Sequence, residues 1–244
     1  MAKKIERLRL DISRKFILND DTQFVIKEAY KAARTNLTFA LATFDPKIAV
    51  VTSCAPAEGK STNCLNLAIT MAEMGESVLL IDGDMRKPVQ HSLLRLENEA
   101  GLSSILGGLV GDVSKVINKN VRPNLDVITA GPIPPNPAEL LAGERMQKLI
   151  DIVGKHYDYI FIDTPPVTVV ADAFVLNERT SGIVFVIKEG FTTHPEIEEA
   201  LRRTKMTNGK ILGFIKSNCA AGGKSGGRSY KYKYKYKYKY NNYS

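Results

Sequence analysis

Residues 52–62, TSCAPAEGKST, combine the groups that a phosphate-binding loop needs. They follow an apolar, strand-like run and precede a helical pattern. Such a loop requires backbone N–H groups that point into a concavity, a Lys for the outer phosphates and a hydroxyl for Mg²⁺, all at the start of a helix. Gly59, Lys60 and Ser61 supply the last part of this pattern, although Cys54 replaces its usual first Gly. The strand and helix on either side favour a nucleotide site over a chance GKST match.

Two other apolar runs end in aspartates, which could bind a metal ion or take up a proton. VLLI runs into Asp82 and Asp84, and YIFI runs into Asp163. A lone Asp at the end of a strand more often shapes a turn or caps a helix, but phosphoryl transfer needs carboxylates beside a phosphate loop. We therefore expect all three to act in metal binding and catalysis. Arg86 could contact phosphate or pair with a neighbouring acid, and the sequence favours neither.

The elements that must position these residues alternate between strands and helices. Apolar periodicity predicts a helix over 24–44, strands at 48–53, 77–82, 125–129, 158–163, 182–187 and 211–216, and helices at 60–75, within 137–154, near 171–178 and at 194–207. This alternation predicts an α/β fold of the P-loop NTPase type, a mostly parallel, doubly wound sheet with helices on both faces. Ligands bind at the carboxyl ends of such strands, where the aspartates and the phosphate loop lie.

The formal net charge of +8 is concentrated at the end of the chain. Residues 220–244 carry seven basic side chains and no acidic one, whereas the remainder is nearly neutral. The charge therefore describes a tail rather than a basic body that would bind nucleic acid or a membrane. Composition divides the chain into an N-terminal arm at 1–22, one globular domain at 23–218 and a flexible, disordered tail at 219–244.

The cysteines and the apolar runs indicate a cytoplasmic protein. Cys54, Cys64 and Cys219 show neither CxxC spacing nor an accompanying Cys/His cluster, which argues against disulfides and structural zinc. Inside the phosphate loop, Cys54 is expected to be a packed side chain rather than a redox sensor. We predict no signal peptide and no transmembrane helix, because the longest apolar runs have the length of strands. Any membrane association is expected to come from a partner.

Seven of the ten tyrosines lie in the last fifteen residues: Tyr230, Tyr232, Tyr234, Tyr236, Tyr238, Tyr240 and Tyr243. Their alternation with lysine has three interpretations. An edge strand is disfavoured by five lysines on one face and by the lack of a hairpin partner. Single-stranded nucleic acid could stack on the rings, or a nucleotide-dependent transferase could use the phenols as its substrate. Seven phosphates would add roughly −10 to −14 charges and reverse the sign of the tail.

Together these motifs resemble the bacterial tyrosine kinases (BY-kinases), the cytoplasmic kinases that accompany capsule and exopolysaccharide synthesis. TSCAPAEGKST is similar to the family's Walker A motif, LLIDGDMRKP to its Walker A′, IFIDTPP to its Walker B and the terminal tyrosines to its autophosphorylation tail. GLSSIL at 101–106 and AGPIPPNPAELL at 130–141 also look like family segments. Walker A alone occurs in many NTPases, whereas this combination, which covers nearly the whole chain, is highly specific.

The resemblance implies an ATP- and Mg²⁺-dependent protein-tyrosine kinase that phosphorylates its own tyrosine cluster in trans and regulates polysaccharide synthesis and export. Its nucleotide-binding residues would be Ala57, Glu58, Gly59, Lys60, Ser61 and Thr62. Lys60 would contact the β and γ phosphates and Thr62 the α phosphate. Lys60, Asp82 and Asp84 would be catalytic, with Asp82 as the base. The metal-binding residues would be Ser61, Asp82 and Asp163.

By the same resemblance, subunits would assemble into a ring through an ExxRxxR pattern on an early helix, and an octamer is one size that the family suggests. Glu28, Lys31 and Arg34 occupy that spacing here. Because Lys cannot form the bidentate contacts of Arg, Lys31 bears directly on the stability of the ring. The expected partners are a separate transmembrane activator, which recruits the kinase to the inner face of the membrane, and a cognate tyrosine phosphatase. Neither nucleic acid nor direct membrane insertion is expected.

Two other functions leave part of the sequence unexplained. A partition- or septum-positioning switch ATPase of the same superfamily would carry a signature Lys at the start of its phosphate loop, where this chain has Ala55. That function also leaves the tyrosines without a role. A nucleic-acid-binding adaptor would use the YK repeat but would make the phosphate loop vestigial. The kinase interpretation accounts for both features.

Overall fold

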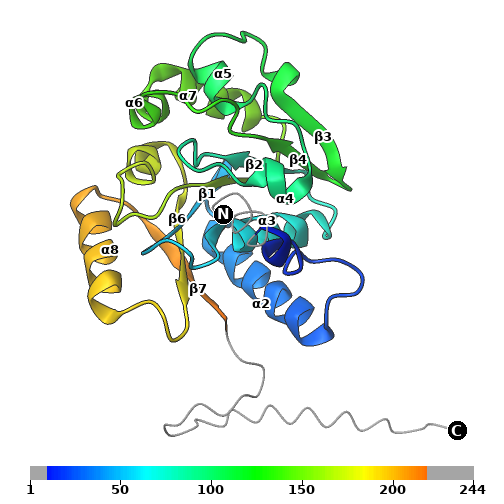
Figure 1. Ribbon diagram of the computed structural model, residues 1–244, viewed down its shortest axis with the longest axis vertical. Helices are drawn as coiled ribbons and strands as arrows, with labels where there is room; N and C mark the ends of the chain where they lie inside the picture. Colours follow the sequence, from blue (N-terminus) through cyan, green and yellow to red (C-terminus); the bar gives the residue numbers. More distant parts are fainter. Residues whose placement is uncertain (1–9, 219–244) are drawn as a thin grey trace, which may run out of the picture.

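Seven strands form a single sheet within residues 10–218, the part of the chain that the computed structural model describes (Figure 1). The strands are β1 (Lys47–Ser53), β2 (Val78–Asp82), β3 (Ile117–Arg122), β4 (Leu125–Ile128), β5 (Tyr159–Asp163), β6 (Gly182–Lys188) and β7 (Ile211–Ser217). Their order is β3-β4-β2-β5-β1-β6-β7; β3 runs antiparallel to β4 and the other neighbours are parallel. The mostly parallel α/β sheet predicted from the sequence is confirmed.

Helices cover both faces of the sheet (Figure 1). They are α2 (Phe24–Leu41), α3 (Lys60–Ala72), α4 (Gln90–Leu94), α5 (Leu102–Leu106), α6 (Pro137–Ala142), α7 (Glu144–Val153) and α8 (His194–Met206), with the 3₁₀ turns η1 (Val113–Val116) and η2 (Phe174–Arg179). Successive strand residues alternate between two cores. Ile48 and Val50 pack with residues of α5 to α8, whereas Ala49 and Val51 pack with residues of α2, α3 and α4. Burial on both faces explains why the strands are continuously apolar.

The register of the parallel strands brings the aspartates together. Asp82, the last residue of β2, lies beside Asp163, the last residue of β5, and Val51 of β1 flanks Asp163 on the other side. The three strands therefore end at one edge of the sheet, where the phosphate loop leaves β1. Loop and carboxylates meet there because of the strand order.

The segment between β2 and β4 is more ordered than apolar periodicity predicts. It contains α4, α5, η1 and the edge strand β3. The sequence of β3, INKNVR, is half-buried or exposed throughout, so it lacks the apolar pattern of the central strands. The helix predicted near 171–178 is instead a 3₁₀ turn, η2, and the helix predicted over 60–75 ends at Ala72.

Residues 10–22, the described part of the predicted N-terminal arm, lie against the domain. Ile17 and Leu18 are buried. The Asn66 side chain of α3 accepts a hydrogen bond from Leu18 N at 2.9 Å and donates one to Phe16 O at 2.8 Å. This segment therefore packs on the same face of the sheet as α3.

Residues 1–9 and 219–244 lie outside the described residues. Cys219 and the seven C-terminal tyrosines belong to the second of these ranges. The division of the chain into arm, domain and tail stays a prediction. Between residues 10 and 218, no helix is both long and apolar enough to cross a membrane.

Candidate active site

The backbone of the phosphate loop explains why its first motif position tolerates Cys54. Gly59 immediately precedes α3 with a φ of 85°, a left-handed conformation that favours Gly, and an added Cβ would lie 3.3 Å from Asn63 Nδ2. Cys54 has no positive φ, and its side chain is fully buried in the core. The loop therefore needs its glycine at position 59 and not at position 54.

The side chain of Glu58, one of the predicted nucleotide-binding residues, is occupied by hydrogen bonds within the protein. Its carboxylate accepts hydrogen bonds from Ala55 N at 2.8 Å and from the Thr192 hydroxyl. Its carbonyl accepts one from Ser217 Oγ at 2.9 Å. These contacts tie the loop to the turn after β6 and to the end of β7. A contact of Glu58 with phosphate therefore falls to its backbone N–H.

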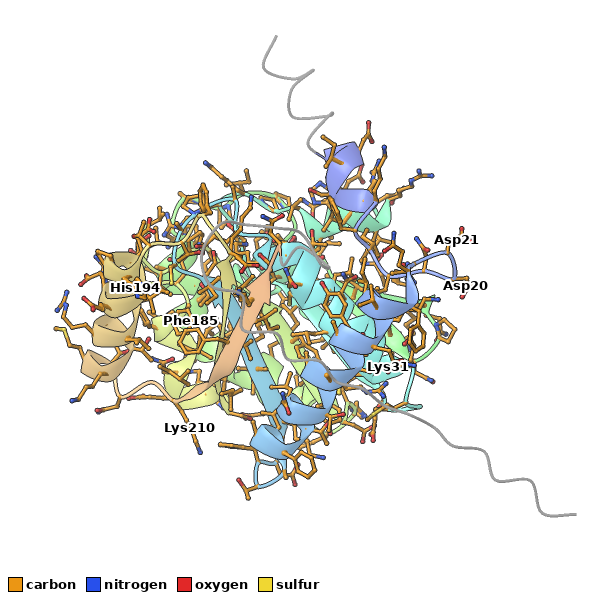
Figure 2. The ribbon with its side chains drawn as sticks, turned by 90° about the horizontal axis from the view of Figure 1, so that it is seen from below. Asp20, Asp21, Lys31, Phe185, His194 and Lys210 are labelled. Atoms are coloured by element: carbon orange, nitrogen blue, oxygen red, sulfur yellow. The ribbon has the colours of Figure 1, made fainter. Side chains whose placement is uncertain are left out.

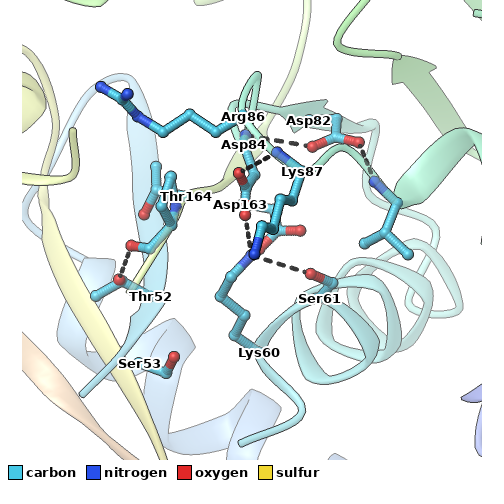
Figure 3. A network of polar contacts seen from close by, with 12 residues as sticks. Thr52, Ser53, Lys60, Ser61, Asp82, Asp84, Arg86, Lys87, Asp163 and Thr164 are labelled. Atoms are coloured by element: carbon cyan, nitrogen blue, oxygen red, sulfur yellow. Dashed lines mark hydrogen bonds and ion pairs between the residues drawn. The ribbon is translucent and has the colours of Figure 1, made fainter. Parts of the chain in front are cut away.

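Lys60 is the centre of a polar network at the carboxyl edge of the sheet (Figure 3). Its Nζ lies 2.9 Å from Asp84 Oδ2, 3.1 Å from Asp163 Oδ1 and 3.1 Å from Ser61 Oγ. Burial alone would lower the pKa of Lys60, but the charges of Asp163 and Asp84 outweigh burial and raise the pKa, so the side chain stays an ammonium. The structure thus brings four predicted site residues into direct contact.

Asp82 lies beside this network and is held by backbone N–H groups. Its Oδ2 accepts hydrogen bonds from Val89 N at 3.1 Å and Gln90 N at 3.0 Å, and its Oδ1 accepts one from Asp84 N at 3.3 Å. Burial, followed by the negative charge of Asp163, raises the pKa of Asp82. Asp82 is therefore a buried carboxylate with an increased affinity for a proton.

Two further side chains of this region were not identified from the sequence. Gln90 is fully buried and donates to Asp163 Oδ2 at 2.9 Å. Asp172, also buried, decides between the two roles considered for Arg86: the guanidinium Nε and Nη2 donate to its carboxylate oxygens at 2.9 and 3.1 Å. Both residues follow irregular segments, so no motif spacing points to them.

The oxygen atoms at this edge suit Mg²⁺ that is bound together with a nucleotide. Mg²⁺ prefers hard oxygen ligands, which Asp82, Asp163 and Ser61 offer, and it commonly takes phosphate oxygens and waters besides one or two carboxylates. Within residues 10–218, no group of three or more His, Cys, Asp and Glu side chains is arranged to hold an ion by itself. The buried Oε1 of Gln90 has no hydrogen-bond partner among the same residues. The site therefore fits an ion that arrives with phosphate.

The three predicted assembly residues do not share one environment. Lys31 Nζ contacts Glu28 Oε1 at 2.8 Å on the half-exposed surface of α2, where Figure 2 labels Lys31. Arg34 is directed towards α3 and donates to Thr70 O at 2.9 Å. Glu28 and Lys31 are thus accessible to another subunit, whereas Arg34 is engaged within its own chain.

Comparison with known proteins connects this geometry to a family. The family model AAA_31, described as an AAA domain, matches residues 46–210. The tyrosine-protein kinase YwqD of Bacillus subtilis is 39% identical over 204 residues, which cover 84% of this chain and 86% of the relative. The chain belongs to the bacterial tyrosine kinases. This kinase is a transferase with a nucleotide-binding P-loop, as its motifs predict.

Solved structures share the fold of this bacterial tyrosine kinase. The chimerical protein CapA2B2 is 36% identical, with a TM-score of 0.76, and the match covers 81% of this chain and 86% of that chain. The kinase domain of Escherichia coli tyrosine kinase ETK is 33% identical, with a TM-score of 0.75 and coverage of 82% and 80%. MinD of Pyrococcus horikoshii, complexed with Mg-ADP, is 22% identical, with a TM-score of 0.59 over 69% of each chain, which shows a common fold alone.

The thiols of this kinase are predicted to resist modification. Cys54 and Cys64 are fully buried; burial and then the charge of Glu58 raise the pKa of Cys54 to about 12, and burial and then Asp163 raise the pKa of Cys64. Since the thiolate is the reactive form, iodoacetamide at about pH 8 should leave both thiols unmodified in the native protein and label both in guanidinium chloride, as read by peptide mass spectrometry. Rapid labelling of native Cys54 would restore the redox-sensor hypothesis.

Proposed function

We propose that this kinase transfers the γ-phosphoryl group of Mg²⁺·ATP to the tyrosines of its own C-terminal cluster, in trans between subunits. The observation that carries the proposal is the contact of Lys60 with Asp84, Asp163 and Ser61 in a member of a tyrosine-kinase family. It places a cation, two carboxylates and a hydroxyl where a phosphate loop enters a helix. The proposed acceptors are Tyr230, Tyr232, Tyr234, Tyr236, Tyr238, Tyr240 and Tyr243.

Residues 57–62 of the loop would bind the nucleotide. Their backbone N–H groups would bind phosphate oxygens, with Thr62 at the α phosphate. Lys60 would exchange its two carboxylate partners for the β and γ phosphates. Ser61, Asp82 and Asp163 would hold Mg²⁺, which when bound neutralises charge on the phosphate oxygens.

Asp82 is the base of the proposed reaction, with Asp84 assisting. As the phenol oxygen attacks the γ phosphorus, Asp82 accepts the phenol proton and the bond from phosphorus to the β–γ bridging oxygen breaks, which leaves ADP. Burial raises the pKa of Asp82 in the protein alone, whereas Mg²⁺ held by the same carboxylate would lower that pKa and keep Asp82 ionised, as a base must be before it accepts the proton.

The cellular setting that we propose follows from the family resemblance. The kinase would act in the cytoplasm at the inner face of the membrane, bound to a separate transmembrane activator, and a cognate phosphatase would reverse its modification. It would form a ring, an octamer being one size, and regulate capsular or exopolysaccharide synthesis and export. At ~3.3 Å per residue, the 25 residues 220–244 could span on the order of 80 Å if fully extended, enough to reach a neighbouring subunit.

Transfer in trans predicts phosphorylation of an inactive subunit. We expect that a Lys60→Ala protein with an intact tail, mixed with active protein that ends at residue 218 and supplied with Mg²⁺·ATP and activator, becomes phosphorylated between residues 230 and 243. Mass spectrometry of that segment measures the result, and Lys60→Ala protein alone is the control. An unmodified tail in the mixture, under conditions where the full-length active kinase modifies itself, would rule out trans transfer. Release of free phosphate without modification of any tyrosine would instead indicate a switch ATPase.

Removal of the proposed base should separate binding from chemistry. Asp82→Asn is expected to slow phosphorylation by about 10²–10⁴-fold, because the amide cannot accept the phenol proton, while ATP still binds. Single-turnover phosphorylation and calorimetric ATP titration measure the two quantities. Asp126→Asn, which alters a half-buried aspartate of β4 that bonds Tyr157, is the matched control. A wild-type rate in Asp82→Asn would exclude Asp82 as the base.

If subunits assemble through α2, replacing Lys31 by the family's arginine should strengthen their self-association. Lys31→Arg should shift the protein towards larger species, because a guanidinium can form two parallel hydrogen bonds with a carboxylate of another subunit. Sedimentation velocity at matched concentrations measures the shift, and Lys148→Arg on the exposed side of α7 controls for the added guanidinium. An unchanged or smaller assembly would show that Lys31 does not limit the ring.

A further inference from the structure

Gln90 connects three parts of the site. It is fully buried at the start of α4. Its Nε2 donates to Asp163 Oδ2 at 2.9 Å and to Ser61 O at 3.0 Å, and its backbone N donates to Asp82 Oδ2 at 3.0 Å. One residue thus contacts the ends of β2 and β5 and the first turn of α3.

The side chain of Gln90 makes the two oxygens of Asp163 different. Asp163 Oδ1 faces Lys60 Nζ at 3.1 Å, whereas Oδ2 receives the amide of Gln90. A neutral amide orients a carboxylate without cancelling its charge, which a Lys or Arg at this position would do. Asp163 is therefore held in one orientation by a neutral partner at Oδ2, and Lys60 at Oδ1 is the cation that Mg²⁺ and phosphate would replace.

The other end of the amide is an unused acceptor. Ser61 O is a backbone carbonyl oxygen that can only accept a hydrogen bond, so the nitrogen of the amide must face it and Oε1 must face away. Gln90 Oε1 is buried and has no partner among the described residues. A buried carbonyl oxygen in a polar site calls for a donor, and a water of a hydrated Mg²⁺ is such a donor.

We propose that Gln90 is a positioning residue that holds Asp163 and Ser61 for Mg²⁺·nucleotide, with Oε1 as an acceptor for the hydration shell of the ion. The inference rests on the proposed function, because it assigns the residue to the same ion. Gln90 acts through Asp163 and Ser61 and not on the reacting atoms. Outer partners of metal ligands commonly contribute ten- to 100-fold to metal affinity.

The bond from the Gln90 backbone to Asp82 persists in any non-proline substitution, so the side chain can be tested separately. We suggest calorimetric titration of the full chain with ADP, once with Mg²⁺ and once with EDTA. The wild type should bind ADP more tightly with Mg²⁺. Gln90→Met has a side chain of similar length without a hydrogen-bond donor, and in EDTA its affinity for ADP should lie within about twofold of that of the wild type. The factor by which Mg²⁺ increases that affinity should be ten- to 100-fold smaller in Gln90→Met than in the wild type. Gln147→Met, which removes an exposed contact with Asp151, should behave as the wild type.

The outcomes separate this inference from the function on which it rests. If the wild type gains nothing from Mg²⁺, the proposed function fails, and this inference fails with it. If Mg²⁺ increases the ADP affinity of the wild type and of Gln90→Met by the same factor, the inference is overturned while the proposed function stands. Thermal unfolding shows whether Gln90→Met folds. If it does not, Gln90→Asn replaces it, since the shorter amide cannot reach both acceptors, and a full Mg²⁺ gain in that variant would overturn the inference too.

Discussion

The site depends on a charge constraint: three buried carboxylates share one edge of the sheet, and Lys60 binds two of them. Asp82, Asp84 and Asp163 are at most 4% exposed. Burial and then the charge of Asp163 raise the pKa of Asp82, and the removal of a carboxylate from water costs several kcal/mol per ion. The ammonium of Lys60 offsets this for Asp84 and Asp163. When Lys60 binds phosphate instead, Asp84 and Asp163 lose their positively charged partner, and the phosphate adds negative charge of its own. In the proposed reaction, this is the physical reason for ATP to enter with a divalent cation.

The sheet imposes this constraint through strand register, which is why much of it could be predicted. Asp82 and Asp163 end neighbouring parallel strands, and an apolar run followed by an acid is visible in the sequence. Gly83 adds a detail that the motif alone does not explain. Its N–H donates to Asp163 O at 2.8 Å, and a Cβ at this position would lie 2.8 Å from the same oxygen. Glycine thus keeps the chain against β5 as it leads from Asp82 to Asp84.

The contacts that could not be predicted depend on the course of irregular segments and on the direction of side chains around a helix, neither of which an apolar pattern encodes. Gln90 reaches Asp163 across 73 positions in sequence, and Arg86 reaches Asp172 across 86, each through an irregular segment. The ExxRxxR spacing does not place its three residues on one side of the helix. Residues three apart on a helix of 3.6 residues per turn differ by about 60° in direction, so Arg34 lies about 120° around the helix from Glu28. Arg34 therefore contacts α3 while Glu28 stays exposed. The polar edge strand β3 escaped prediction because half-exposed strands lack an apolar run.

The same constraint bears on the substrate of the proposed reaction. A site with three carboxylates attracts a basic peptide and repels an acidic one, and the tail sequence sets a lysine on each side of most of its tyrosines. A neutral phenol between two ammonium groups therefore suits the site before transfer. Each phosphate adds about −1.5 to −2 charges, so every transfer reduces the attraction between the tail and the aspartates. The carboxylates that prepare the site for a cation would thus also favour release of the modified tail, and the charge that organises the chemistry would limit how long the product stays bound.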